Sequence, residues 1–145
     1  MIAPALVFAI ALSLGGHAGA PTGCQSRGLL PDAACTPGAV STTSLDVVCG
    51  TATRGRRKVN RALRRRVLHA YGLPLHEEPG AYEIDHLVPL ELGGSNDFAN
   101  LWPEAAPGFH DKDRVEDELH RRVCSGRMSL VAAQAAIARD WTTAR

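Results

Sequence analysis

Polar and apolar residues alternate from 82 to 90, which is the pattern of a short strand. Pro89 cannot donate a ladder hydrogen bond, so pairing should stop near it, and turn-forming residues follow at 93–97. The chain returns over 99–102, so the two segments predict a hairpin with a long loop. From His110 onward apolar residues recur every four positions, which predicts a helix. The predicted order is strand, loop, strand, helix.

Two more helices and one more short strand are expected outside this unit. A helix over 57–71 is predicted by four apolar residues at helical spacing: Val59, Leu63, Val67 and Ala70. Gly72 should end that helix. Ser129 should cap a final helix whose apolar face includes Trp141, which we expect in the core rather than stacked on a base. Residues 45–49 are compatible with a short strand.

The first residues have the features of a secretory signal. Residues 1–20 carry no charged side chain, and their apolar run over 2–14 is shorter than the roughly 20 residues that span a bilayer. Small residues allow cleavage after Ala20 or after Ala18. Lipid attachment at Cys24 is a weaker alternative, since Pro stands where lipoprotein signals carry Leu. We therefore expect a secreted or periplasmic protein with no stable membrane association after signal removal.

Signal removal leaves a chain suited to one small domain, with a cysteine-containing arm at 21–53 and the remainder at 54–145. The four cysteines are Cys24, Cys35, Cys49 and Cys124. An even count behind an export signal predicts disulfides, and three pairings are open. We favour Cys49 with Cys124, because that bond would join the segment before the 57–71 helix to the end of the helix after His110. A four-cysteine zinc site is less consistent with export and the wide spacings.

The formal net charge of +1 conceals two opposed blocks. Residues 54–66 contain eight basic side chains and no acid, whereas residues 77–118 contain twelve acids and two bases. Such a basic surface can simply be solvated, but mutual repulsion of its charges favours a polyanionic partner, DNA or RNA. The candidate nucleic-acid-binding residues are Arg56, Arg57, Lys58, Arg61, Arg64 and Arg65.

Several polar side chains of the predicted hairpin and helix have the chemistry that phosphodiester hydrolysis needs. His86 is a candidate general base, since the pKa of histidine is near neutral, and Asn100 could fix its ring by a hydrogen bond. Asp85 and His110 could hold one divalent metal, with water and a phosphate oxygen completing the shell. Two further residues could support this site: Glu83 and Lys112. Taken singly, such residues are usually turn, cap or exposed residues; their order together favours a site.

This arrangement resembles the HNH nuclease family, also called the ββα-metal fold. The matching residues are Asp85 and His86, the turn at Gly93 and Gly94, Asn100 with Leu101, and His110 followed by Lys112. More narrowly, the segment is similar to a group of small secreted bacterial HNH-like proteins, over roughly the last two thirds of the chain. The resemblance implies one divalent metal ion, Mg²⁺ in the first place and Mn²⁺ or Zn²⁺ as alternatives. Many HNH proteins carry paired CxxC zinc knuckles; this chain has no CxxC, so its fold must be held another way.

The sequence therefore predicts an α+β fold: a small single domain with a ββα-metal hairpin and helix core at about 82–124, flanking helices and disulfides. The predicted function is a secreted metal-dependent endonuclease acting on DNA or RNA. One alternative is a non-catalytic, disulfide-bonded extracellular protein that binds polyanions. Another is an antibacterial toxin nuclease, which would require an inhibitor protein in the producing cell.

Overall fold

A computed structural model describes residues 21–50, 56–76, 80–106 and 108–145. The predicted signal at 1–20 and the start of the basic segment, including Arg54, lie outside the described residues. The described chain is a small α+β fold with two strands and four helices, which follow one another as α1 (Leu45–Gly50), α2 (Arg61–Ala70), β1 (Tyr82–His86), β2 (Leu101–Ala105), α3 (Phe109–Cys124) and α4 (Leu130–Asp140). Two 3₁₀ turns, η1 (Leu90–Leu92) and η2 (Phe98–Asn100), lie in the loop between the strands.

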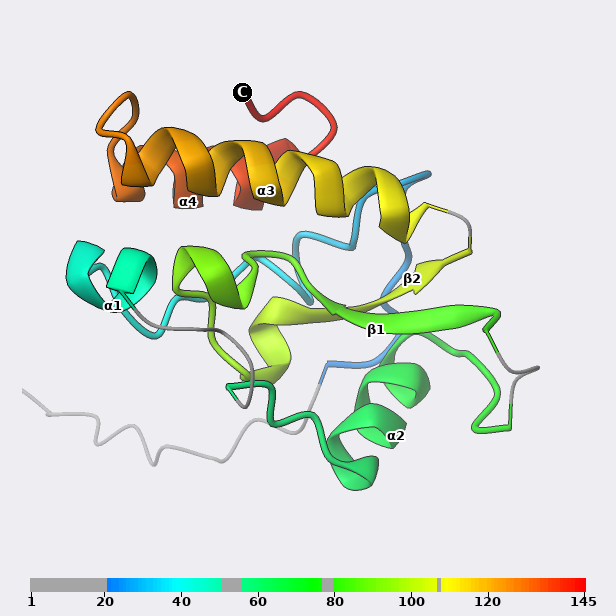
Figure 1. Ribbon diagram of the computed structural model, residues 1–145. Helices are drawn as coiled ribbons and strands as arrows, with labels where there is room; N and C mark the ends of the chain where they lie inside the picture. The colour runs from blue at the N-terminus through cyan, green and yellow to red at the C-terminus, as the bar shows by residue number, and fades with distance from the viewer. Residues whose placement is uncertain (1–20, 51–55, 77–79, 107) are drawn as a thin grey trace, which may run out of the picture.

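The β1–β2 hairpin lies between helices (Figure 1). Helix α3 crosses one side of the hairpin, with α4 beside it, and α2 lies on the opposite side. The predicted order of strand, loop, strand and helix is therefore present, and both α3 and α4 occupy their predicted segments. Ser129 caps α4 as expected, since its hydroxyl accepts from the backbone N–H of Ala132 at 3.2 Å.

The strand register determines which side chains face which helix. The strands pair antiparallel, with Asp85 opposite Trp102 and His86 opposite Leu101. Successive side chains point to opposite faces, so Asp85 faces α3 while His86 faces the segment that precedes α2. Pro103 is tolerated inside β2 because β2 pairs with β1 on one edge only among the described strands.

One predicted helix boundary and one predicted element type are wrong. Helix α2 begins at Arg61 rather than at residue 57, because the Asn60 side chain accepts from the Leu63 N–H and caps the helix there. Residues 45–49 form helix α1 instead of a strand. The segment buries a single side chain, Val48, so no alternating face is present for a sheet to use.

The predicted bond between Cys49 and Cys124 is present and joins α1 to the end of α3. The second disulfide joins Cys24 to Cys35, and two bonds of this kind are typical of a protein that folds in an oxidising compartment. Among the described residues, no helix is long and apolar enough to cross a membrane.

The cysteine-containing arm packs into the core rather than extending from it. Cys24 donates its backbone N–H to Ala70 at the end of α2, and the indole of Trp141 donates to the Leu29 carbonyl at 2.7 Å. Trp141 is buried, which confirms its expected place in the core. The core is formed mainly by these side chains: Leu68, Ile84, Leu87, Leu92, Leu101, Trp102, Leu119 and Ile137.

Candidate active site

Asn100 holds the loop that follows β1. Its side-chain oxygen accepts from the backbone N–H groups of Val88 (2.9 Å) and Ala39 (3.2 Å). Its amide nitrogen donates to the carbonyls of Val88 and Ser95, both at 2.9 Å. All four hydrogen bonds go to backbone groups and none to the imidazole of His86, so Asn100 acts on the loop and does not have the role that the sequence suggested.

The paired glycines allow this loop to close on itself. A Cβ at Gly94 would collide with the Val88 carbonyl, so only glycine fits. Gly93 has a positive φ of 79°, and a Cβ there would lie 2.6 Å from the Thr42 carbonyl oxygen. The Gly-Gly signal in the sequence thus has a steric cause at both positions.

His86 is 3% exposed, and both of its ring nitrogens have partners. Nδ1 lies 3.1 Å from Nη1 of Arg57, and Nε2 lies 3.1 Å from Oδ1 of Asn96. A guanidinium has donors only, so Nδ1 must be the acceptor and Nε2 must carry the hydrogen. Burial, together with the charge of Arg57, lowers the pKa of His86, partly offset by the Asn96 hydrogen bond. The ring is therefore neutral, as a general base requires.

Asn96 is the residue that orients the imidazole. Its Oδ1 also accepts from the Lys58 N–H at 2.8 Å, and its Nδ2 donates to the Arg56 carbonyl at 2.9 Å. These two bonds fix which end of the amide faces His86. In the sequence Asn96 lies in a run of turn formers, and nothing there separates an Asn that forms a turn from one that holds a ring.

Lys112 links Asp85 of β1 to α3 by an ion pair. Its side chain is 0% exposed, and Nζ donates to Asp85 Oδ2 and to the His86 carbonyl, both at 2.7 Å, and to Glu116. Burial alone would lower the pKa of Lys112, but the charges of Asp85 and Glu116 more than offset it and raise the pKa. Lys112 therefore stays protonated, and its three acceptors hold it in place. Glu116 was not predicted as a site residue, although its spacing of four from Lys112 on one helix was a signal for the contact.

Negative charge exceeds positive charge around this lysine. Glu104 is 2% exposed, and its carboxyl faces that of Asp85, with no donor from any other described residue on its oxygens. Burial and the charge of Asp85 raise its pKa, and burial raises the pKa of Glu116 as well. Three carboxyls around one ammonium favour a retained proton or an added cation.

The predicted metal ligands lie in the same acidic neighbourhood but make no closed site. Burial and the charges of Asp85 and Asp113 raise the pKa of Glu83. Asp113 in turn lies 3.7 Å from Nδ1 of His110, a side chain that is 73% exposed. Among the described residues, no three ligand atoms of this neighbourhood lie within 4.8 Å of one another. The described residues of this neighbourhood offer no closed set of protein ligands for a structural zinc ion, and an ion held there would keep several waters, as Mg²⁺ does.

The described residues contain one group of three with metal-binding spacing, Cys49, His120 and Cys124. Both cysteines are in the disulfide, so neither offers a thiolate while that bond is intact. His120 lies with Nε2 at 3.2 Å from the Val48 carbonyl, which can only accept, and its side chain is half-buried.

The predicted nucleic-acid-binding residues divide into two groups. Arg56, Arg57 and Lys58 precede α2, and through Arg57 this extended segment reaches His86. Arg61 and Arg65 are exposed on α2, and Arg64 is half-buried. Arg66 has a packing role, because its guanidinium lies 5.0 Å from the centre of the Phe98 ring.

Comparison of the chain with protein-family models, curated proteins and solved structures gives no match. The likeness to HNH nucleases therefore rests on the motif residues and on the order of the hairpin and α3.

Proposed function

We propose that this protein is an exported, metal-dependent endonuclease that hydrolyses phosphodiester bonds in DNA or RNA. The observation that carries the proposal is the contact between Arg57 and His86 at 3.1 Å. It joins the N-terminal part of the basic segment to a neutral, buried imidazole whose neighbour in sequence is Asp85. A side chain that can attract a polyanion therefore lies in direct contact with the candidate general base.

His86 would act as the general base through Nδ1. In the resting arrangement the Nδ1 lone pair accepts from Arg57, whose second guanidinium nitrogen donates to the Ile84 carbonyl. A phosphate oxygen is a stronger acceptor for a guanidinium than a neutral imidazole is. Substrate therefore draws Arg57 toward the phosphate and exposes Nδ1 to a water molecule, so that binding of the backbone frees the base.

Asp85 and His110 would hold the divalent ion, with Glu83 and Asp113 adding negative charge around it. Mg²⁺ suits the carboxylates of this site, whereas Mn²⁺ or Zn²⁺ would accept the imidazole of His110 more readily. The ion, when bound, stabilises charge that develops on the leaving oxygen. Lys112 keeps Asp85 in place from the side of α3.

A non-catalytic polyanion-binding protein is the second candidate. The observation that favours it is that Asp85 and His86 already have partners, Lys112 for the carboxylate and Arg57 with Asn96 for the ring. In that case the same contacts would serve only to hold the basic segment against the hairpin.

The deciding experiment incubates purified protein with supercoiled plasmid and with RNA, in Mg²⁺, Mn²⁺, Zn²⁺ or EDTA. We expect metal-dependent cleavage, which His86→Ala lowers by about 10²-fold to 10⁴-fold with binding retained. His110→Ala should lose activity through metal affinity and recover part of it at high metal concentration. His69→Ala is the matched control for loss of an imidazole, since His69 is exposed on α2. Binding without cleavage in every metal would establish the second candidate instead.

A further inference from the structure

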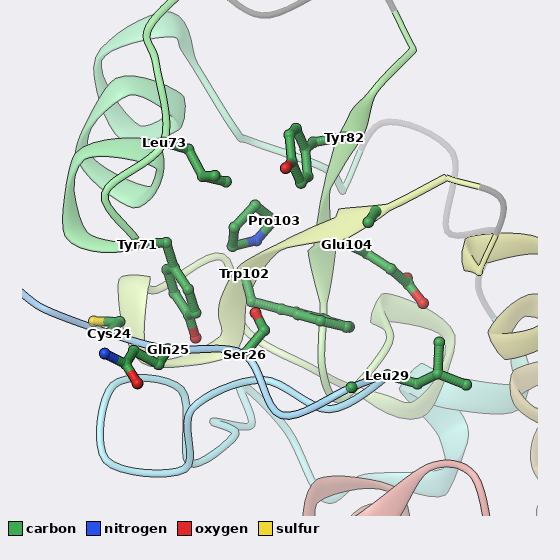
Figure 2. Close-up of a pocket in the computed structure, with 12 residues that line it drawn as sticks. Cys24, Gln25, Ser26, Leu29, Tyr71, Leu73, Tyr82, Trp102, Pro103 and Glu104 are labelled. Carbon is green, nitrogen blue, oxygen red and sulfur yellow. The ribbon is translucent and has the colours of Figure 1, made fainter.

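The disulfide between Cys49 and Cys124 is the more accessible of the two disulfides. Both of its cysteines are exposed, and Cys124 lines two surface hollows of about 530 and 540 Å³. Cys24 and Cys35 are only 4% and 7% exposed. Cys24 lies on the pocket shown in Figure 2, and among the described residues no histidine lines that pocket. An attacking thiolate therefore reaches the bond between Cys49 and Cys124 more readily.

An imidazole lies against this accessible bond. His120 and Cys124 are four residues apart on α3, so they share one face of the helix, and His120 Nε2 is 3.5 Å from Cys124 Sγ. Two side chains at this helical spacing can bind one zinc ion together. Cys49 comes from the last turn of α1. One ligand atom from each of the three residues lies within 4.8 Å of the other two, which is the spacing of a metal site.

We propose that reduction of this bond by a low-molecular-weight thiol creates a zinc site formed by Cys49, His120 and Cys124. The exchange consumes two molecules of the thiol, R–SH, and yields two cysteine thiols and one R–S–S–R. Zn²⁺ then replaces the hydrogen of each cysteine thiol, so two protons are released for each ion bound. A chain destined for export meets such thiols where it is made, because the cytosol keeps cysteines reduced.

Zinc suits these ligands in type and geometry. Thiolate and imidazole are its usual protein ligands, and water can fill the fourth tetrahedral position. Around a tetrahedral ion the two sulfurs must lie about 3.8 Å apart. Their Cα atoms are 5.6 Å apart, so side-chain rotation is sufficient. Binding through Nε2 costs the imidazole its hydrogen bond to the Val48 carbonyl, and the ring hydrogen moves to Nδ1.

The charges around the site favour an ion that brings thiolates with it. The hollow beside His120 is lined by three basic residues: Arg121, Arg122 and Arg127. Glu118, which also lines it, is paired with Arg121. These arginines oppose a bare cation, but Zn²⁺ with two thiolates carries no net charge. Helices α1 and α3 would therefore be linked by a disulfide in oxidising surroundings and by a metal ion in reducing ones.

The test is titration of the full mature protein with Zn²⁺ in competition with a chromophoric chelator. One sample is oxidised, and the other is reduced by a monothiol that is then removed without oxygen. We expect the reduced form to bind one Zn²⁺ at least about 100-fold more tightly than the oxidised form. Co²⁺ in place of zinc should give a sulfur-to-cobalt charge-transfer band in the reduced form only. That band separates this site from any ion held at Asp85 and His110.

Variants assign the ligands. His120→Ala should weaken zinc binding by the reduced protein at least about 10-fold, since even loss of a residue that only orients a metal ligand costs that much. His69→Ala, which removes an exposed histidine on α2, should not weaken it. Replacing both Cys49 and Cys124 by serine should remove the cobalt band, whereas the same change at the second disulfide should retain it.

Melting temperatures cover the case in which reduction loosens the fold. Zinc should raise the melting temperature of the reduced protein more than that of the oxidised protein, because an ion that binds only the folded form stabilises it. Equal zinc affinity in both forms, a reduced protein without the cobalt band, or unchanged affinity in His120→Ala would overturn the inference. Nucleic acid is absent from every measurement, so the outcome does not depend on the proposed nuclease function.

Discussion

Two asparagines near His86 illustrate what residue chemistry leaves open. Both Asn96 and Asn100 lie near a Gly-Gly turn, and the sequence indicated Asn100 as the residue that holds the ring. Asn100 is buried and bonded only to backbone groups, whereas Asn96 is partly exposed and bonded to Nε2 of His86. An amide can make either set of bonds, so the sequence could identify the type of residue required but not the one in contact.

These different contacts predict different defects. Asn100→Ala leaves four backbone groups of the core without partners and should lower the free energy of unfolding by about 3 kcal/mol or more. Asn96→Ala should cost only about 1 kcal/mol, but lower cleavage about 10-fold to 100-fold because the imidazole loses its orientation. Urea denaturation and initial cleavage rates measure the two effects. An Asn100→Ala protein as stable as the wild type would contradict this assignment.

The carboxyl of Glu104 should make stability depend on pH. Because burial, with Asp85, raises the pKa of Glu104, the folded protein keeps a proton that the unfolded chain releases above pH of about 4.5. Stability therefore falls as pH rises from there toward the folded pKa. Glu104→Gln removes this titration, so its melting temperature should exceed that of the wild type by a margin that grows from pH 5 to pH 8 in EDTA. A constant margin would mean that Glu104 is ionised in the fold.

At the scale of elements, periodicity predicted the hairpin, α3 and α4, and it failed where a single polar residue decides the boundary. Asn60 starts α2 four residues later than the apolar spacing indicates. This shift matters for the proposed site, because it leaves Arg57 and Lys58 in a non-helical segment that contacts His86 and Asn96. A helix over 57–71 would have placed these side chains on its own surface.

The division of the basic segment predicts two kinds of variant. Arg61→Gln and Arg65→Gln, on the exposed side of α2, should weaken nucleic-acid binding and reduce its salt slope by roughly 0.9 for each phosphate that the variant no longer neutralises. Their cleavage rate at saturating substrate should be unchanged. Arg57→Gln should also raise the pKa of His86, since the charge of Arg57 lowers it.

The pH profile separates these variants. The proposed general-base role requires neutral His86, so a higher pKa of His86 should move the acidic limb of the rate profile to higher pH in Arg57→Gln and leave it in place in Arg61→Gln. Rates at saturating substrate between pH 5 and pH 8 would show the shift. Identical profiles for the two variants would remove Arg57 from the proposed mechanism.

At the scale of the whole molecule, a two-stranded sheet is too small to form a stable core by itself. The helices and the arm complete the core, and two disulfides fix the segments that lack sheet pairing. The pairing of Cys49 with Cys124 was favoured among three open pairings because it would join the segment before the basic helix to the end of the helix after His110. The burial of the arm was not, because its composition, rich in small and turn-forming residues, is also that of a flexible segment.

The two disulfides should contribute unequally to stability. The bond between Cys49 and Cys124 spans 75 residues, and the bond between Cys24 and Cys35 spans 11. Loop-closure entropy therefore predicts losses of about 4 and about 3 kcal/mol when each pair is replaced by serine. Chemical denaturation of the two double variants measures this difference, with the wild type under reducing conditions as the limiting case.

The longer bond should also matter for the proposed activity. It anchors α3, and Lys112 on α3 holds Asp85 of β1 by an ion pair. At denaturant concentrations where the protein is still folded, loss of the longer bond should therefore reduce metal-dependent cleavage, whereas loss of the shorter bond should not. If the shorter bond proves the more important for activity, then the arm, rather than the position of α3, controls the site.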